Sequence, residues 1–428
     1  MKYLLTLTSL ILSSATAFSQ NVNQAQQTID TLCSEYFSGR GYVNDGDIRA
    51  SVYIADRYKQ IGLVPLSGDD YYHRFSLNVN TFPTKVSVES DSKKITPGKD
   101  FIVAPNCPTV DKSDLTVRLV DKSLLCDKKR FKELLKLDWT KNVLLLDTLV
   151  HDKLSQKRLD KLLKKYNSNV LFEVKKKLTW SLSRDQSSDV RVYFLPGVLN
   201  DKQHISISIE AQFVEGYKSR NVVGMIPGTE QPDSFIFITG HYDHLGMMGQ
   251  NCIMPGANDN ASGIAMILDF ATYYKLHPPR YSVVFIAFAA EEAGLVGSYF
   301  FVSELSKYAP KLDPRKIRFV VNMDLMGSGQ EGIMAVNGAI LPEEYALLSE
   351  INTDKGYLPQ TKKRGKAANS DHYFFTEAGI PAFFFYLMGP YNHYHDVDDT
   401  AENMRLEAES YNGAFHLIRD FMNALMHH

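Results

Sequence analysis

The sequence predicts an α/β protein: a three-layer α/β/α sandwich around a mostly parallel mixed sheet, with a smaller β-rich domain inserted into it. Residues 235–300 carry this prediction. Two short apolar runs, 235–239 and 283–287, are typical of strands buried on both faces of a parallel sheet. Between them, apolar residues recur at helical spacing, namely Ile264, Ile267, Leu268 and Ala271. Polar residues follow both strands, at the edge where open α/β sheets place ligand sites.

Length and composition indicate an ordinary globular protein. A chain of 428 residues is long for one domain and suggests two. Apolar residues make up 44% and charged residues 22%, which is enough to build a core. The formal net charge of −2 favours neither a nucleic acid nor an anionic membrane as partner. The sequence leaves the oligomeric state open.

Residues 1–20 have the features of a signal peptide. Lys2 supplies the positive start, residues 4–12 the short apolar stretch, and Ala15-Thr16-Ala17 a small-residue cleavage site. The stretch is too short to span a bilayer, and no later segment reaches the required length. No Cys follows it closely, so we expect no lipid anchor. We therefore expect an exported mature chain, periplasmic or extracellular.

The cysteines give no sign of a metal site of their own. Cys33, Cys107, Cys126 and Cys252 are widely spaced and form no CxxC pair, which argues against thiolate zinc sites. An oxidising compartment permits disulfides, but the sequence leaves the pairing open.

Residues 81–211 differ in residue pattern from the segments on either side. Helical spacing dominates residues 22–62, with Gly62 as a stop. From 81 to 211, short β-like runs alternate with lysine-rich segments, the runs being 85–89, 115–119, 142–146, 190–194 and 205–209. Leu159, Leu162, Leu163 and Tyr166 mark one amphipathic helix there. We interpret 81–211 as an inserted β-rich domain and its lysines as a solvated surface.

After Tyr217, strands alternate with helices. Strands are expected at 221–226, 234–241, 281–289, 317–324 and 381–387. Helices are expected at 261–275, 297–307, 342–354, 372–378 and 406–426. This alternation predicts a largely parallel sheet with helices on both faces. The main domain therefore comprises residues 21–80 and 212–428.

Acidic residues and histidines gather where the expected strands end. They are His241, Asp243, Asp259, Glu291, Glu292, Asp324 and His395, with Tyr394 beside the last. If five of them bind metal, two divalent ions can each take one imidazole nitrogen and one terminal carboxylate, and share one Asp. Three carboxylates and one hydroxide, about −4, would balance two divalent ions. Singly, each residue has an ordinary explanation as a cap or surface group, so the five loops together carry the hypothesis.

Four segments resemble the motifs of the co-catalytic zinc exopeptidases, the family that includes bacterial leucyl-type aminopeptidases, glutamate carboxypeptidases and glutaminyl cyclases. They are GANDNASG (256–263), EEAGLVGS (291–298), NMDLMG (322–327) and HDVDDT (395–400). Ser370-Asp371-His372 and the following GIPA (379–382) also resemble that family. The resemblance covers the N-terminal helices and Tyr217 to the C-terminus. It implies the zinc exopeptidase fold, and the inserted block is similar to a protease-associated domain.

The resemblance also implies roles for individual residues. His241, Asp259 and Asp324 would hold one zinc ion; Asp259, Glu292 and His395 would hold a second, giving two Zn²⁺ per chain. Asp243 would fix the His241 ring, Glu291 would be the general base, and Tyr394 would stabilise the oxyanion. The Asp259-Asn260 bond would be cis. The last motif has Asp396-Val397 where Thr-Pro is common, which leaves His393 as a weaker competitor for the metal.

The function implied is that of a secreted zinc aminopeptidase, which removes N-terminal residues from peptides by a metal-bridged hydroxide with Glu291 as base. Three alternatives stay open. A carboxypeptidase could use Lys362, Lys363, Arg364 and Lys366 to hold a C-terminal carboxylate. A glutaminyl cyclase would work with a single zinc ion, and a binding ectodomain would have lost its ligands. The substrate side-chain preference is not determined by the sequence.

Overall fold

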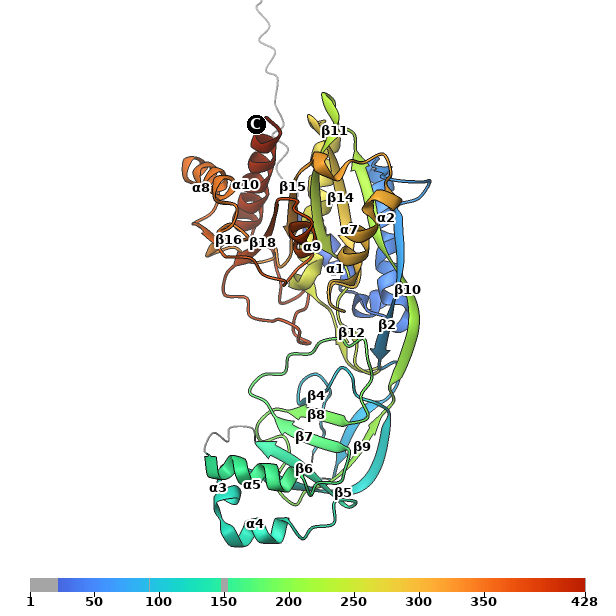
Figure 1. The fold of residues 1–428 in the computed structure, drawn as a ribbon, viewed down its shortest axis with the longest axis vertical. Coiled ribbons are helices and arrows are strands. Elements are labelled where there is room, and N and C mark those ends of the chain that lie inside the picture. The colour runs from blue at the N-terminus through green and yellow to red at the C-terminus, as the bar shows by residue number, and fades with distance from the viewer. Residues whose placement is uncertain (1–21, 92, 148–152, 428) are drawn as a thin grey trace, which may run out of the picture.

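The computed structural model describes residues 22–91, 93–147 and 153–427. The expected signal peptide therefore lies outside the described residues. Two separate large sheets organise the rest, one in the upper and one in the lower part of Figure 1. Among the described helices, none combines the length and the apolar character needed to cross a membrane.

Nine strands form the main sheet. They are β1 (Val64–Pro65), β2 (Tyr72–Thr81), β10 (Gln212–Ile226), β11 (Gln231–His241), β14 (Tyr281–Phe288), β15 (Ile317–Met323), β16 (Gly332–Val336), β17 (Thr361–Lys363) and β18 (Ala382–Met388). The order is β1-β10-β14-β11-β15-β18-β16-β17, with β2 also paired to β10. The central strands β14, β11, β15 and β18 run parallel, while β10 and β16 pair antiparallel with their neighbours in that group. The sheet is therefore mixed with a parallel centre, as expected.

Helices cover both faces of this sheet. Along β11, Ile236 and Ile238 face one buried cluster, whereas Phe235 and Phe237 face another. The first cluster contains residues of α1 (Val22–Leu32), α2 (Gly46–Ile61), α6 (Ser262–Leu276), α8 (Pro342–Lys355) and α10 (Ala408–His427). The second contains residues of α7 (Val296–Tyr308) and α9 (His372–Glu377). Strands that are apolar on both faces thus form the middle of three layers.

The strand order places a ligand site at the end of β11. From β11 the chain passes through α6 to β14 on one side, and then through α7 to β15 on the other. Open α/β sheets bind ligands outside the carboxyl ends of the strands at such a point of divergence. The ends of β11, β14, β15 and β18 meet there.

The second sheet is formed by the chain between β2 and β10, two strands that pair with each other in the main sheet. β2 and β10 pair from Thr81 and Gln212 onward, so the chain leaves the main sheet at one and returns at the other. The seven strands between are β3 (Val86–Ser90), β4 (Phe101–Val103), β5 (Val110–Val120), β6 (Asn142–Asp147), β7 (Val170–Val174), β8 (Val190–Phe194) and β9 (His204–Ile209). Their order is β3-β9-β5-β6-β7-β8-β4. We interpret residues 81–211 as a domain inserted into the main domain.

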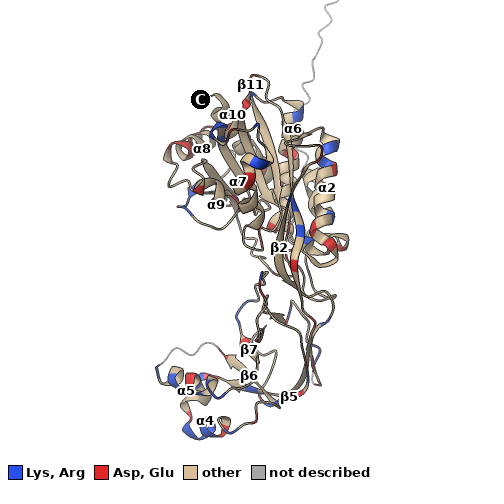
Figure 2. Ribbon diagram, turned by 45° about the vertical axis from the view of Figure 1, so that its right-hand side comes forward, with Lys and Arg blue, Asp and Glu red and all other residues tan. Residues whose placement is uncertain are grey.

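This second unit contains more helix than expected. Strands β5, β6, β7 and β8 pair in parallel, and parallel neighbours need long crossovers, commonly helical. The helices are α3 (Lys122–Cys126), α4 (Lys128–Leu134) and α5 (Lys153–Leu163), and Lys and Arg gather on α4 and α5 in Figure 2. The four cysteines are free thiols, and two of them, Cys107 and Cys252, are buried.

Candidate metal centre

The expected site residues converge on the carboxyl edge of the main sheet. His241 ends β11, the Glu291-Glu292 pair follows β14, and Asp324 follows β15. Asp259 lies in the short segment η3 (Ala257–Ala261) that leads into α6, and His395 lies in the loop after β18. Parallel strands end at the same edge, so residues far apart in sequence come together.

His241 forms the first group with two carboxylates. Its Nε2 lies 3.2 Å from Asp259 Oδ1 and 3.2 Å from Asp324 Oδ1. All three side chains are buried. One imidazole nitrogen and two carboxylate oxygens at this separation are a donor set that suits a zinc ion.

His395 forms the second group around the other oxygen of Asp259. Its Nε2 lies 3.2 Å from Asp259 Oδ2 and 3.1 Å from Glu292 Oε2. Asp259 thus presents one carboxylate oxygen to each imidazole, and the two groups share it. The Asp259-Asn260 peptide bond is cis, as the resemblance implied.

The ring of His241 is fixed by a backbone group. Its Nδ1 donates to the backbone oxygen of Asp243 at 3.1 Å, while the Asp243 carboxylate is 3.9 Å away. That carboxylate instead accepts the backbone N–H groups of Glu291 (3.1 Å) and Glu292 (3.3 Å). In this structure the His241 ring is hydrogen-bonded to the backbone oxygen of Asp243 and not to the carboxylate expected from the sequence, and that carboxylate orients the Glu291-Glu292 turn instead. Either way Nε2 is left as the unprotonated nitrogen, as a metal ligand requires.

His244 holds the second carboxylate of the pair. It is buried, and its Nδ1 lies 2.7 Å from Glu292 Oε1. His244, Asp259 and Glu292 could therefore also be taken as a metal-binding group. The Nε2 of His395 faces both Asp259 and Glu292, whereas the close contact of His244 is with Glu292 alone, so we take His395 as the ligand and His244 as the residue that orients Glu292. The competitor expected from the sequence, His393, lies with Asp396 and Asp398 in a separate group.

The electrostatics of the cluster suit a cation. Burial alone would lower the pKa of His395, but Glu292 and Asp259 raise it to about 11. Burial alone would raise the pKa of Glu292, but His395 lowers it to about 2. Burial holds the pKa of Asp324 above its usual range, and its Oδ1 is buried without a hydrogen bond. A buried carboxylate oxygen without a donor, facing an imidazole nitrogen, fits a bound metal.

Glu291 and Tyr394 face a cavity beside the cluster. The cavity has a volume of about 200 Å³ and is lined by His241, Asp259, Glu291, Asp324, Leu325, Arg364, Asn369, Phe384, Tyr386, Tyr394 and His395. Burial, together with Glu292, Asp371 and Asp324, raises the pKa of Glu291 well above its usual range, although His241 opposes the shift. The Tyr394 ring stacks on His395 with centroids 3.9 Å apart. A substrate in this cavity would meet both residues and the metal-binding groups.

Several residues that the sequence did not single out hold the framework. Asp399 accepts the backbone N–H groups of Asn258 (2.9 Å) and Asp259 (3.1 Å). Asn260 donates to the backbone oxygen of Met323 (3.0 Å) and so ties the Asp259 segment to the end of β15. Position alone could have indicated Asp399, because it lies four residues after His395 in a matched motif.

Ser370, quoted in the sequence as part of a motif, also supports the cluster. Its hydroxyl donates to Asp324 Oδ2 at 3.0 Å and accepts from the Asn322 amide at 2.8 Å. Asp324 therefore has one oxygen held by Ser370 and the other directed at His241.

Comparisons with known proteins agree with this fold. The solved structure of BSAP, a zinc aminopeptidase from Bacillus subtilis, matches with a TM-score of 0.66 at 18% identity, over 95% of both chains. The aminopeptidase from Aneurinibacillus sp. strain AM-1 matches with a TM-score of 0.58 at 18% identity, over 94% of this chain and 93% of that one. At such identities the likeness shows the fold, which is that of the α/β zinc exopeptidases.

Sequence relatives point the same way. Aminopeptidase YwaD of Bacillus subtilis (strain 168) is 30% identical over 197 residues, which are 44% of this chain and 41% of the relative. A probable zinc metalloprotease of Pyricularia oryzae is 33% identical over 126 residues, 27% of this chain and 24% of the relative. The chain thus spans about two fifths or less of these relatives' length.

The fold is that of the α/β zinc exopeptidases, and the donor cluster supplies residues that could hold a metal ion. Within that class, residues 221–422 match the sequence model of peptidase family M28. The matched span contains every expected metal ligand, from His241 to His395.

Proposed function

We propose that the protein is an exported zinc-dependent aminopeptidase that binds two zinc ions per chain and removes N-terminal residues from peptides. The observation that carries the proposal is the sharing of Asp259 between two imidazoles, at 3.2 Å from each through different oxygens. His241, Asp259 and Asp324 would hold one ion, and Asp259, Glu292 and His395 the other. Bound zinc lowers the pKa of water and polarises a carbonyl group.

The chain's own residues supply proton transfer and positioning. Glu291 lines the cavity beside the ligands, so its carboxylate can take a proton from water and deliver it to the leaving amine. The Tyr394 hydroxyl, on a ring stacked against His395, can donate to the oxygen on which charge develops. Asp243 holds the backbone of both glutamates, which keeps Glu291 toward the cavity and Glu292 toward His395.

Arg364 favours one competing assignment, a carboxypeptidase. Of the four basic residues considered, Arg364 lines the cavity. Lys366 pairs with Glu377 and Lys363 lies over the Tyr345 ring, so both are engaged elsewhere. A guanidinium in the cavity could bind a C-terminal carboxylate, since it recognises carboxylates bidentately.

Export is part of the proposal and is supported by residues 1–20. Lys2, the apolar stretch after it and Ala15-Thr16-Ala17 have the order of a cleavable signal. N-terminal sequencing of protein recovered from the periplasm or medium tests this part. A start within a few residues of position 20 is expected, whereas retention of Met1 would contradict export.

Hydrolysis of amino-acid nitroanilides tests the activity. We expect hydrolysis that a chelator abolishes and added zinc restores, with about two zinc ions bound per chain by elemental analysis. Peptides with free N-termini should be shortened from that end, and the N-acetylated peptides should remain intact. Cleavage of N-acetylated peptides from the C-terminal end would establish the carboxypeptidase instead, and a metal-replete protein without a stoichiometric divalent ion would overturn both.

A further inference from the structure

The loop that carries His395 is bonded to the second sheet's unit. The Nδ1 of His395 donates to the backbone oxygen of Trp180 at 2.9 Å. In return, the backbone N–H of Trp180 donates to the backbone oxygen of His395 at 3.0 Å. The two residues are 215 positions apart, and Trp180 lies between β7 and β8. A residue of the inserted unit thus contacts the ring of an expected metal ligand directly.

Trp180 is itself firmly held within the inserted unit. Its side chain is 2% exposed and belongs to the hydrophobic cluster of the second sheet. The indole Nε1 donates to the backbone oxygen of Val103, the last residue of β4, at 2.9 Å. The ring also lies against Phe82, with centroids 6.1 Å apart. The position of the Trp180 carbonyl is therefore set by this cluster, which also contains Leu245, Met248, Cys252 and Met254 of the main domain.

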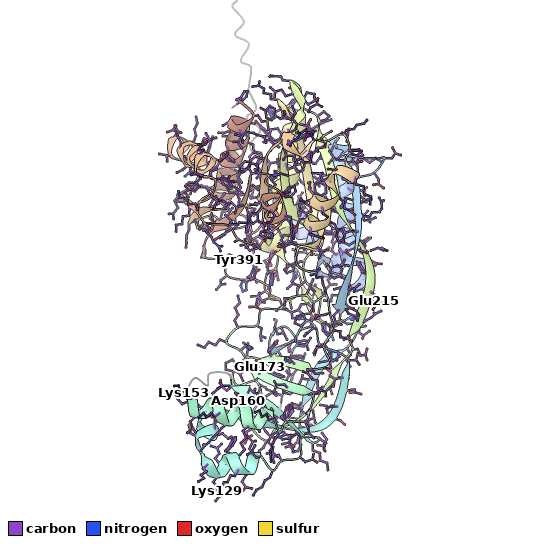
Figure 3. The ribbon with its side chains drawn as sticks, in the orientation of Figure 1. Lys129, Lys153, Asp160, Glu173, Glu215 and Tyr391 are labelled. Carbon is purple, nitrogen blue, oxygen red and sulfur yellow. The ribbon has the colours of Figure 1, made fainter. Side chains whose placement is uncertain are left out.

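Further contacts join the same two segments. Lys177 donates to the backbone oxygen of Asn392 at 3.0 Å and lies 3.7 Å from the Asp396 carboxylate. Val397 packs against the hydrophobic cluster of the second sheet. Figure 3 shows Tyr391, in the same loop, at the edge of the upper part that faces the lower part. The loop from Tyr391 to Val397 is thus held at several points by the inserted unit.

The backbone of His395 requires such support. Its φ is 54°, in the left-handed region that few residues other than glycine adopt. Residues in this region persist where the surrounding structure over-determines them. The reciprocal bonds with Trp180 fix both the backbone and the ring of His395. When the ring is neutral, as a metal ligand must be, the bond from Nδ1 to Trp180 leaves Nε2 as the free nitrogen toward Asp259 and Glu292.

We propose that the inserted unit is a structural part of the metal centre: Trp180 positions His395 for the metal site formed with Asp259 and Glu292. The other site, formed by His241, Asp259 and Asp324, has no residue of the inserted unit within its donor set. The inference rests on the proposed dizinc function and adds that one of the two sites depends on the inserted unit. Trp180 is a positioning residue, since it acts through His395.

The experiment compares the two tryptophans of the chain, Trp139 and Trp180. Both are buried in the inserted unit, but Trp139 belongs to the separate cluster beneath α4 and α5. Zinc affinity is measured by competition with a chromogenic chelator for the full-length protein and for Trp180→Ala and Trp139→Ala. In Trp180→Ala we expect one of the two zinc ions to bind about 10- to 100-fold more weakly, as for other loosened supports of metal ligands. The second ion should bind as in the unchanged protein, and Trp139→Ala should leave both affinities within about threefold.

If the Trp180→Ala and Trp139→Ala proteins do not fold, phenylalanine substitutions at the same two positions provide the test. Trp180→Phe keeps the aromatic packing and loses the Nε1 bond to Val103, so one zinc site should still weaken at least threefold relative to Trp139→Phe. Equal zinc affinities in the Trp180 and Trp139 variants would overturn the inference, as would equal weakening of both sites. If the unchanged protein binds no zinc, the dizinc function itself fails, which is a different outcome from two intact sites in Trp180→Phe.

Discussion

Two neighbouring side chains at the end of β14 face different surroundings. Glu292 lies between His395 and His244, whereas Glu291 lines the cavity. The two residues lie in the turn that follows β14, and the fixed backbone of this turn directs their side chains to different surroundings. Asp243 secures this turn by accepting both backbone N–H groups.

Glu291→Gln separates proton transfer from metal binding. The amide keeps the shape of the side chain but cannot take a proton, so the rate should fall by about 10²- to 10⁴-fold. The zinc content, measured by elemental analysis, should stay unchanged. Loss of zinc in this variant, with retention in Glu292→Gln, would mean that the two glutamates have exchanged roles.

The zinc content of two further variants distinguishes the roles of His244 and His395. His395→Ala removes a proposed ligand, so one of two zinc ions should be lost on dialysis. His244→Ala removes only the group that holds Glu292, so both ions should still bind, one of them about 10- to 100-fold more weakly. Zinc content and chelator competition measure both effects, and the reverse pattern would make His244 the ligand.

At the scale of elements, Asp47 joins α2 to β10. Its two carboxylate oxygens accept from the hydroxyls of Tyr217 (2.6 Å) and Ser219 (2.8 Å) in the strand. Burial raises the pKa of Asp47 to about 6, although both hydrogen bonds lower it. This contact places the N-terminal helix pair against the edge of the main sheet.

Asp47 gives the fold a dependence on pH. The carboxyl of an unfolded chain titrates near pH 4, so between about pH 4 and 6 the folded state binds more protons. The free energy of unfolding therefore falls as pH rises through this range. The side chain introduced by Asp47→Asn cannot titrate. In this variant the free energy of unfolding should therefore decline less between pH 4 and 6, by on the order of 2–3 kcal/mol. Urea denaturation at pH 4, 5, 6 and 7 measures both slopes, and identical slopes would contradict the assignment.

At the scale of the whole molecule, one buried arginine joins the N-terminal helices to the metal-binding edge. Arg40 is 0% exposed and donates to the backbone oxygens of Leu32, Tyr242, Pro255, Gly256 and Asp259. It thereby connects the end of α1, the residue after β11 and the segment around Asp259.

Arg40→Met should destabilise the whole domain. It removes every donor and leaves buried carbonyl groups unsatisfied, at about 1–3 kcal/mol each when no water replaces them. We expect a loss of on the order of 3–5 kcal/mol in the free energy of unfolding. Arg405→Met, which breaks only an exposed pair with Asp30, should cost less than about 1 kcal/mol. Equal losses in the two variants, measured by denaturant unfolding, would contradict the role of Arg40.

Local patterns predicted much of the main sheet. The expected strand at 281–289 corresponds to β14, and the expected helix at 261–275 corresponds to α6, each to within one residue. Such elements are apolar or periodic enough to be recognised alone. β2 and the first half of β10 were missed, because half-exposed paired strands alternate with polar residues and owe their stability to each other.

The sequence by itself determined which side chains could bind metal and that they follow strands of one parallel sheet, because apolar runs and motif residues are local features. Only the tertiary structure decided how each ligand is held: His241 by a backbone oxygen of Asp243, Glu292 by His244, and His395 by Trp180. The reason is physical. A hydrogen bond to a backbone carbonyl carries no side-chain signature, and a partner 215 residues away is set by packing of the whole chain.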